Sequence, residues 1–148
     1  MPRSAFAYSD EDTARARERL VGKWYGKVTH EDGTVQRWLV HRAEDGTYLI
    51  HFRVTAPDGE IRDSREIGMW GIRMPIYFTS VQYFVEDDRA MPADTRRPAL
   101  YDAYRVQKLT DDIFRYRSYR SGTRFEVRKV APDFEMPAAP DEQGGDNP

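Results

Sequence analysis

Three Asp-Gly pairs divide the first half of this 148-residue chain, and they constrain its fold more than any other feature. The pairs are Asp32-Gly33, Asp45-Gly46 and Asp58-Gly59, so successive turns lie 13 residues apart. Between them apolar and polar residues alternate, which is the period of a β-strand with one buried face. Asp-Gly between two such runs is a strong hairpin signal, because both central residues of a type I′ turn need positive φ. The pattern predicts an antiparallel meander.

The alternation continues beyond residue 60 and brings the number of predicted strands to eight. These strands are residues 23–30, 35–43, 48–55, 60–70, 76–85, 100–109, 114–120 and 124–130. Residues 86–98 form the one long connection, and the segment 81–98 is either a plain link or a lid over a barrel mouth. Neighbour-to-neighbour hairpins favour a closed barrel over a sandwich, since closure removes both sheet edges. We therefore predict an all-β fold, an eight-stranded antiparallel up-and-down barrel with room for packed side chains or one small ligand.

The two ends of the chain differ from this middle. Ser9 is a suitable N-cap, and the three acidic residues that follow it suit the first turn of a short helix over about residues 10–20. Residues 1–8 before it are predicted to be a flexible arm. Residues 131–148 contain four prolines, two adjacent glycines and only acidic charge, which predicts a disordered tail. The chain thus reads as a single domain, residues 9–130, with an arm and a tail.

Composition excludes several classes of function. The absence of cysteine rules out disulfides, thiolate catalysis and Cys-based metal sites. A net charge of −2 argues against a nucleic-acid partner, and no apolar run approaches the roughly 18 residues that span a bilayer. The first 20 residues lack the apolar core of a secretory signal, so we expect a cytoplasmic protein or a mature form. No phosphate-binding loop, dinucleotide fingerprint or nucleophile elbow is present, so no cofactor is predicted.

Gly22-Lys23-Trp24 opens the first predicted strand directly after the predicted helix. It resembles the Gly-x-Trp start of the lipocalin and wider calycin superfamily, in the style of short bacterial lipocalin-like domains of unassigned function. In that superfamily the Trp closes one end of the barrel and a basic residue of the last strand lies across it. The resemblance implies this plug role for Gly22 and Trp24, with Arg128, or its neighbour Lys129, as the basic residue. The chain departs from the family because it lacks the later sequence signatures, the disulfide and the terminal helix. The resemblance implies small-molecule binding.

A strand register follows if each Gly-containing turn is two residues long. His30 then pairs with Val35, and His41 pairs with Ile50. The Ser121-Gly122 turn likewise pairs Tyr116 with Val127, with both side chains inside. The predicted inward side chains of the first three strands are Trp24, Val28, His30, Val35, Leu39, His41, Tyr48, Ile50, Phe52 and Val54. The same register points Trp70 outward, which a bulge at Gly68 would correct.

This register also points charged side chains into the barrel. Arg37, His41, Asp63 and Arg65 would project inward beside aromatic residues. An unpaired charge in a packed core is costly, so such an interior is wet, internally paired or occupied by a ligand. We therefore predict a pocket for a small, partly apolar organic molecule. Its predicted ligand-binding residues are Arg37, His41, Tyr48, Phe52, Arg65 and Tyr116.

Two alternatives stay open at this point. The first is an enzyme of the same fold, an isomerase, cyclase or lyase, with His41 or Asp63 as the base and a tyrosine as the proton donor. The second is an interaction module with a filled barrel, whose outer patch could also serve as a homodimer surface. Its outer patch would consist of Tyr25, Trp38, Val40 and Leu49. The three histidines do not predict a metal site, because the register places His51 on the opposite face from His30 and His41.

Overall fold

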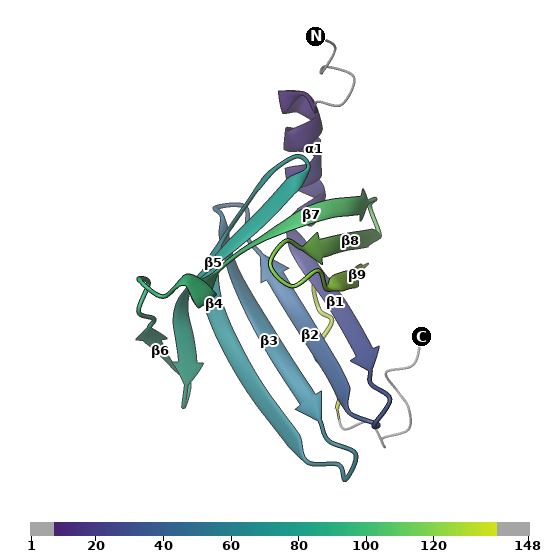
Figure 1. The fold of residues 1–148 in the computed structure, drawn as a ribbon, viewed down its shortest axis with the longest axis vertical. Helices are drawn as coiled ribbons and strands as arrows, with labels where there is room; N and C mark the ends of the chain where they lie inside the picture. The colour runs from purple at the N-terminus through teal and green to yellow at the C-terminus, as the bar shows by residue number, and fades with distance from the viewer. Residues whose placement is uncertain (1–7, 139–148) are drawn as a thin grey trace.

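The computed structural model describes residues 8–138, which form one α-helix, nine β-strands and a 3-10 turn (Figure 1). The elements are α1 (Asp10–Leu20), β1 (Gly22–Thr29), β2 (Val35–Arg42), β3 (Thr47–Thr55), β4 (Ile61–Arg73), β5 (Ile76–Glu86), β6 (Arg89–Pro92), η2 (Pro98–Leu100), β7 (Tyr101–Leu109), β8 (Ile113–Ser118) and β9 (Arg124–Val130). The predicted helix is confirmed. Ser9 caps it in a reciprocal capping box with Asp12.

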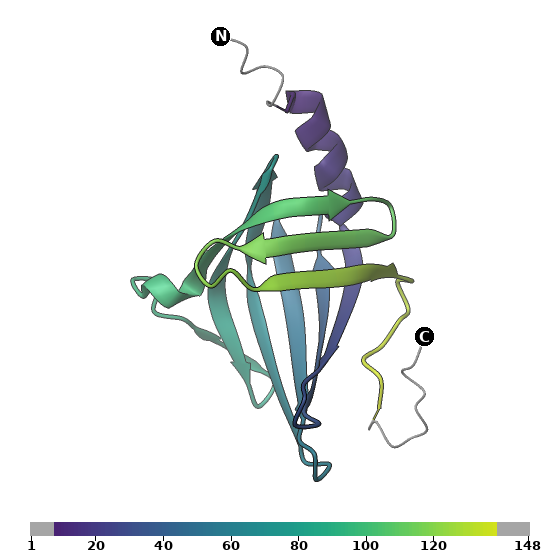
Figure 2. The same ribbon diagram turned by 45° about the vertical axis from the view of Figure 1, so that its right-hand side comes forward.

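The strands close into the predicted barrel. Their order is β4-β3-β2-β1-β9-β8-β7-β5-β6, and a further β4–β5 pairing joins the ends of the ring, so β6 alone stays outside it. In Figures 1 and 2 the long strands β1 to β4 form one wall, and β7 to β9 cross them at a steep angle. The long strands extend beyond this crossing layer at the end opposite the helix. We call the two ends of the barrel the helix end and the far end.

The long connection contains the one strand that the sequence pattern did not predict. β5 and β6 form a tight hairpin in which Glu86 pairs with Arg89. The two residues between them, Asp87 and Asp88, both have positive φ, at 51° and 62°. This is the two-residue turn geometry that was predicted for the Asp-Gly pairs. β6 pairs with the C-terminal part of β5, from Tyr83 to Glu86, and with no other strand in the described chain.

The Asp-Gly hairpins themselves have three-residue loops, so the predicted register is wrong. The Gly33 N–H donates to the His30 carbonyl (2.9 Å), and the His30 N–H donates to the Thr34 carbonyl (2.8 Å). Gly33 has φ +94°, the left-handed conformation that follows a type I turn in a three-residue hairpin. The same hydrogen-bond pattern closes the loops that end at Gly46 and Gly59.

The extra loop residue exchanges the two faces of β2. Trp24 pairs with Val40 rather than with His41, and Ile50 also pairs with Val40. Because side chains alternate with a period of two, a one-residue slip turns every side chain of a strand to the other face. Trp38, Val40 and Arg42 are therefore buried on the inner face, whereas His41 is exposed on the outer face.

β4 follows the same shift. It pairs with β3 without interruption, so Trp70 is buried on the inner face and needs no bulge to reach it. An irregularity does occur next to Gly68, where β5 carries an extra residue, Gln82. A Cβ at Gly68 would collide with the Ser80 carbonyl and the Tyr48 ring, so glycine is required for the close approach of β5.

The helix end is closed by a tryptophan, as the resemblance implies. Trp24 is fully buried, and its indole N–H donates to the Leu20 carbonyl (3.1 Å). The Lys129 Nζ lies 4.9 Å from the Trp24 ring and donates to the carbonyls of Arg19 (2.9 Å) and Val21 (2.8 Å). The basic residue across the plug is therefore Lys129. Arg128 points to the outer face, because neighbours on a strand alternate.

Residues 131–138, the start of the predicted tail, contain no helix or strand and lie on the outer face of the barrel. The Phe134 ring packs 5.1 Å from that of Tyr25, with the Arg128 guanidinium over both rings. The Arg53 Nη1 donates to the Pro137 carbonyl (2.7 Å). The disorder predicted for residues 139–148, and the flexible arm up to residue 7, lie outside the described residues. Within the described part, no helix has the length and hydropathy needed to cross a membrane.

Candidate ligand-binding site

The barrel interior contains two adjoining cavities of about 130 and 280 Å³. Ile50, Phe52, Tyr104 and Tyr116 line both cavities and so join them. The larger cavity lies toward the far end and is mainly apolar. Its further lining includes Gln36, Trp38, Val54 and Phe125. The smaller cavity lies toward the helix end and carries the polar groups. Its further lining includes Arg42, Tyr48, Glu66, Tyr77, Thr79 and Asp102.

Arg42 is the most deeply placed charge of this site. Its side chain is 1% exposed, and its Nε donates to the Tyr77 hydroxyl (2.9 Å). The guanidinium lies over the rings of Tyr77 (4.9 Å) and Phe114 (5.5 Å), which face it with their negative π-surfaces. Its Nη1 is buried and has no hydrogen-bond partner among residues 8–138. A buried donor in that state costs stability, so a partner such as a ligand or an ordered water is expected there.

Aromatic side chains of β7, β8 and β9 form a cluster that bounds the cavities on that side of the barrel. Tyr116 stacks between Phe114 (4.3 Å between centroids) and Phe125 (5.4 Å) and meets Tyr104 edge-on (5.2 Å). Burial raises the pKa of the Tyr48, Tyr104 and Tyr116 hydroxyls far above their usual value. These groups therefore remain neutral, and each can donate one hydrogen bond into the cavity.

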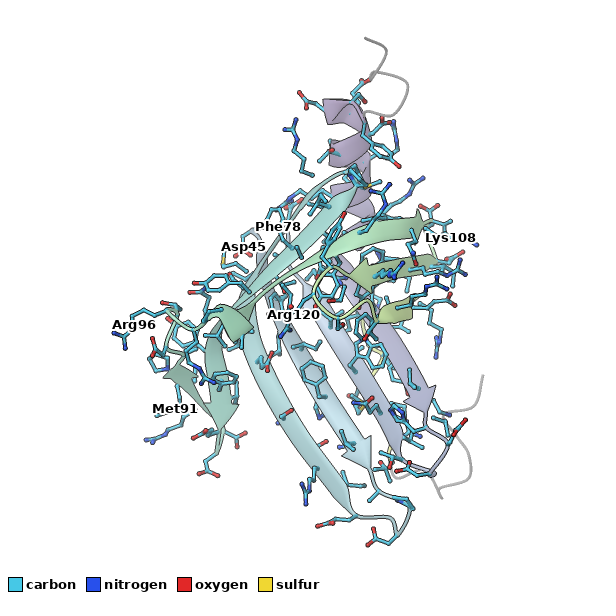
Figure 3. The ribbon with its side chains drawn as sticks, viewed as in Figure 1. Asp45, Phe78, Met91, Arg96, Lys108 and Arg120 are labelled. Carbon is cyan, nitrogen blue, oxygen red and sulfur yellow. The ribbon has the colours of Figure 1, made fainter. Side chains whose placement is uncertain are left out.

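Two carboxyl groups line the smaller cavity. Glu66 is half-buried, and burial, with a smaller contribution from Asp102, raises the pKa of its carboxyl. Asp102 accepts a hydrogen bond from Arg120 Nη2 (2.8 Å), which comes from the turn between β8 and β9 (Figure 3). The polar end of the site thus combines a buried cation, an ion pair and a carboxyl whose pKa is raised by burial.

The structure divides the six predicted ligand-binding residues between the two faces. Tyr48, Phe52 and Tyr116 line the cavities. His41 and Arg65 are exposed on the outer face, so the predicted inward orientation is wrong for both. The cause is the three-residue loops described above. Arg37 borders the larger cavity but lies on the outer face of β2, where it is buried.

The predicted catalytic candidates also lie outside the barrel. Asp63 accepts hydrogen bonds from Arg53 Nε (2.8 Å) and is within 3.1 Å of His51 Nε2. The Arg53 hydrogen bond lowers the pKa of the Asp63 carboxyl, with a further contribution from His51. His41 is on the same outer face and lines neither of the two interior cavities. The expected arrangement of a base beside a substrate cavity is therefore absent for this pair.

Sequence reasoning missed Arg42, Glu66, Asp102 and Tyr104. β2 carries an apolar pair on each face, Trp38 and Val40 on one and Leu39 with Val35 on the other, so alternation alone does not tell which face is inside. The stronger signal was Trp38, because a tryptophan is rarely left exposed. Placing it inward would have brought Arg42 inward as well.

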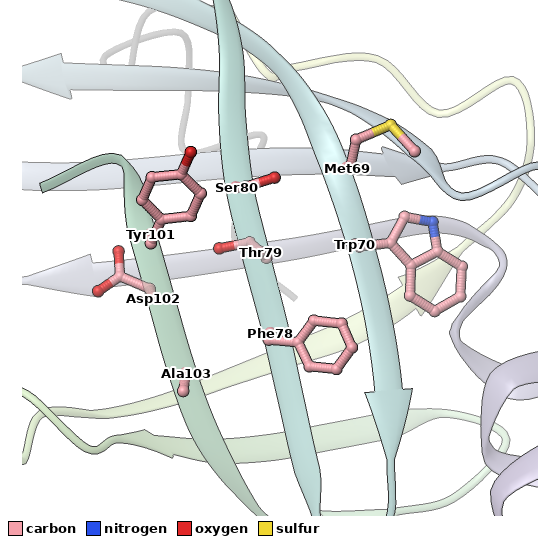
Figure 4. Close-up of a pocket in the computed structure, with 8 residues that line it drawn as sticks. All are labelled: Met69, Trp70, Phe78, Thr79, Ser80, Tyr101, Asp102 and Ala103. Atoms are coloured by element: carbon pink, nitrogen blue, oxygen red, sulfur yellow. The ribbon is translucent and has the colours of Figure 1, made fainter. Parts of the chain in front are cut away.

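A third cavity, of about 440 Å³, lies on the outer surface of β4, β5 and β7. Figure 4 shows its lining side chains on three neighbouring strands, with Met69, Phe78 and Tyr101 exposed by 43%, 45% and 47%. It differs from the predicted interaction patch, of which Trp38 and Val40 lie inside and Tyr25 is covered by the Phe134 ring. Leu49 alone of that patch is exposed.

Over the described residues no cluster of His, Asp or Glu side chains could hold a metal ion. No protein-family model and no curated protein matches the chain.

Several solved structures are similar to this chain. A lipocalin-like protein from Bacteroides uniformis is 16% identical, with a TM-score of 0.41 over 76% of this chain and 99% of that one. An uncharacterized protein from Bacteroides eggerthii is also 16% identical, with a TM-score of 0.43 over 74% and 98%. A de novo designed fluorescence-activating β-barrel is 21% identical, with a TM-score of 0.40 over 78% and 97%. The ring of eight antiparallel strands, closed at the helix end by Trp24 and Lys129, is a lipocalin-like fold.

Proposed function

We propose that this protein binds a small, partly apolar organic molecule inside the barrel. The observation that carries the proposal is the pair of adjoining cavities, with apolar walls at the far end and polar groups at the helix end. Ligand pockets have this composition, mostly apolar surface with a few polar groups that fix orientation. The apolar part of the ligand would contact Ile50, Phe52 and Phe125.

The size of the cavities limits the ligand. The larger cavity, at about 280 Å³, is near the lower bound of the roughly 300–1,000 Å³ typical of small-molecule pockets. A compact aromatic or branched aliphatic molecule fits this space better than a long lipid chain. The tyrosine hydroxyls and Arg42 then offer hydrogen bonds to one polar end of that molecule.

Two adjacent residues on opposite faces of β3 provide the test. Ile50 lines both cavities, whereas Leu49 is 42% exposed on the outer face. Ile50→Trp would fill the cavities, and Leu49→Trp adds the same ring outside. The neutral fluorophore N-phenylnaphthylamine brightens in apolar surroundings, so its titration reports binding. We expect Ile50→Trp to weaken binding at least about tenfold and Leu49→Trp to leave it unchanged. Equal affinity in both variants, or no binding to the unmodified protein, would contradict the proposal.

A further inference from the structure

Arg42 is a cation that the described residues leave incompletely compensated. An arginine stays charged at every physiological pH, and moving that charge out of water is costly. Its Nε donates a hydrogen bond to the Tyr77 hydroxyl, and two aromatic rings lie against the face of the guanidinium. No carboxylate forms an ion pair with it among residues 8–138, and Nη1 has no partner there.

The position of this guanidinium matters as much as its missing partner. Arg42 lines the smaller cavity, whose other walls carry the hydroxyl groups of Tyr48 and Thr79. A small anion in this cavity would therefore meet a charged N–H donor and hydroxyl donors together. Charge-assisted hydrogen bonds of this kind are about twice as strong as neutral ones.

We infer that the ligand carries an anionic group, a carboxylate or a group of similar size, which Arg42 binds at the helix end of the cavity. The inference rests on the proposed function, because it names the class of molecule that occupies the same site. The apolar remainder of the ligand would extend toward Phe52 at the far end.

The two carboxyl groups of the cavity do not oppose an anion strongly. Asp102 is paired with Arg120 at 2.8 Å, which leaves this pair without net charge. Glu66 is half-buried, and burial raises the pKa of its carboxyl, which makes a negative charge there less favourable than in water. A cationic ligand would leave the Arg42 Nη1 still without an acceptor, so the anionic class fits the cavity better.

Three naphthyl probes of similar size and different charge test the inference. Naphthylacetate is anionic, naphthylacetamide is neutral, and naphthylethylammonium is cationic. Calorimetric titration of the full chain at neutral pH gives the three affinities. We expect the carboxylate to bind at least about tenfold more tightly than the amide, and the ammonium to bind most weakly. If the amide or the ammonium binds as tightly as the carboxylate, the inference is wrong while the proposed function stands. If none of the three binds, both fail.

Variants then place the selectivity at one residue. Arg42→Met should remove the preference for the carboxylate and keep the affinity for the amide. Arg42→Lys keeps a cation and should keep part of the preference, so it serves if the methionine variant does not fold. Arg65→Met removes an arginine from the outer face of β4 and is the matched control, with no expected effect. A preference that persists in Arg42→Met, or is lost in Arg65→Met, would overturn the assignment.

Discussion

The two ends of the barrel interior differ in how completely they are filled. At the helix end the side chains of Leu20, Trp24 and Phe114 are 0% exposed, and α1 contributes its buried Ala16 and Leu20 to the core. At the far end Phe52 and Val54 are only half-buried and line the larger cavity. There β1 to β4 extend beyond the crossing strands, so no facing layer covers these side chains (Figure 2). The same alternation of residues builds both ends. The difference indicates that one end supplies most of the packing energy, which leaves the other free to bind.

The largest expected effect compares one residue type at the two ends. Phe114→Ala removes a fully buried ring and should lower the free energy of unfolding by about 3–5 kcal/mol. Phe52→Ala removes a half-buried ring beside a cavity and should cost about 1–2 kcal/mol, since less surface is lost from contact. Urea unfolding measures both. Equal costs would show that the two ends contribute alike to stability.

Phe52→Ala also sharpens the comparison from the side of binding. It should weaken N-phenylnaphthylamine binding, because Phe52 lines both cavities. A loss of affinity together with a small loss of stability would separate the binding end from the folding end.

An intermediate effect is expected where the two ends meet. Gly26 pairs with Trp38 across β1 and β2, and a Cβ at this position would overlap the Trp38 ring. Gly26→Ala should therefore cost about 1–3 kcal/mol by overpacking. Trp38→Phe removes the overlapping ring atoms, so the double variant should lose less stability than the two single costs added together. Strict additivity in urea unfolding would show that the ring is not the cause.

Two hairpins show which part of the fold the sequence could predict. The Ser121-Gly122 turn was predicted to pair Tyr116 with Val127, and the structure pairs Tyr116 with Phe125. This slip is two residues long, so Tyr116 still faces inward. The Asp-Gly hairpins slipped by one residue, which reversed β2. Strand existence and order follow from the alternating pattern, whereas the facing of a strand depends on loop length, and Asp-Gly suits loops of two and of three residues.

The same dependence on strand facing decided which residues of the candidate site could be predicted. Tyr48, Phe52 and Tyr116 were placed inside because their strands keep the correct face. Arg42 was missed because its strand carries apolar residues on both faces, and its neighbour His41 took its place in the prediction. The tail contacts of Phe134 are beyond any local pattern, because they join residues more than a hundred positions apart, such as Lys23 Nζ and the Phe134 carbonyl (3.0 Å).

The smallest expected effect compares a carboxyl inside the barrel with one outside it. The pKa of Glu66 is raised above its usual 4.5, chiefly by burial, so the folded state holds this proton more tightly than the unfolded state. Its contribution to stability is present below pH 4.5 and is lost as the pH rises through the raised pKa. The pKa of Asp63 is lowered from its usual 3.8, chiefly by Arg53, so its contribution is present above pH 3.8 and is lost as the pH falls.

The two neutral variants should therefore change stability in opposite directions. Relative to the unmodified protein, Glu66→Gln should gain stability as the pH rises above 4.5. Asp63→Asn should be less stable above pH 3.8, and this loss should disappear as the pH falls through the lowered pKa of Asp63. Both effects should stay below about 1 kcal/mol, because both groups are partly exposed and solvent screens them. Urea unfolding at a series of pH values measures them. If Glu66→Gln follows the same sign as Asp63→Asn, then Glu66 is charged and paired in the folded state, and the polar end of the cavity is more anionic than its burial indicates. An anionic ligand would then be disfavoured there, so this small effect bears directly on the chemistry assigned to Arg42.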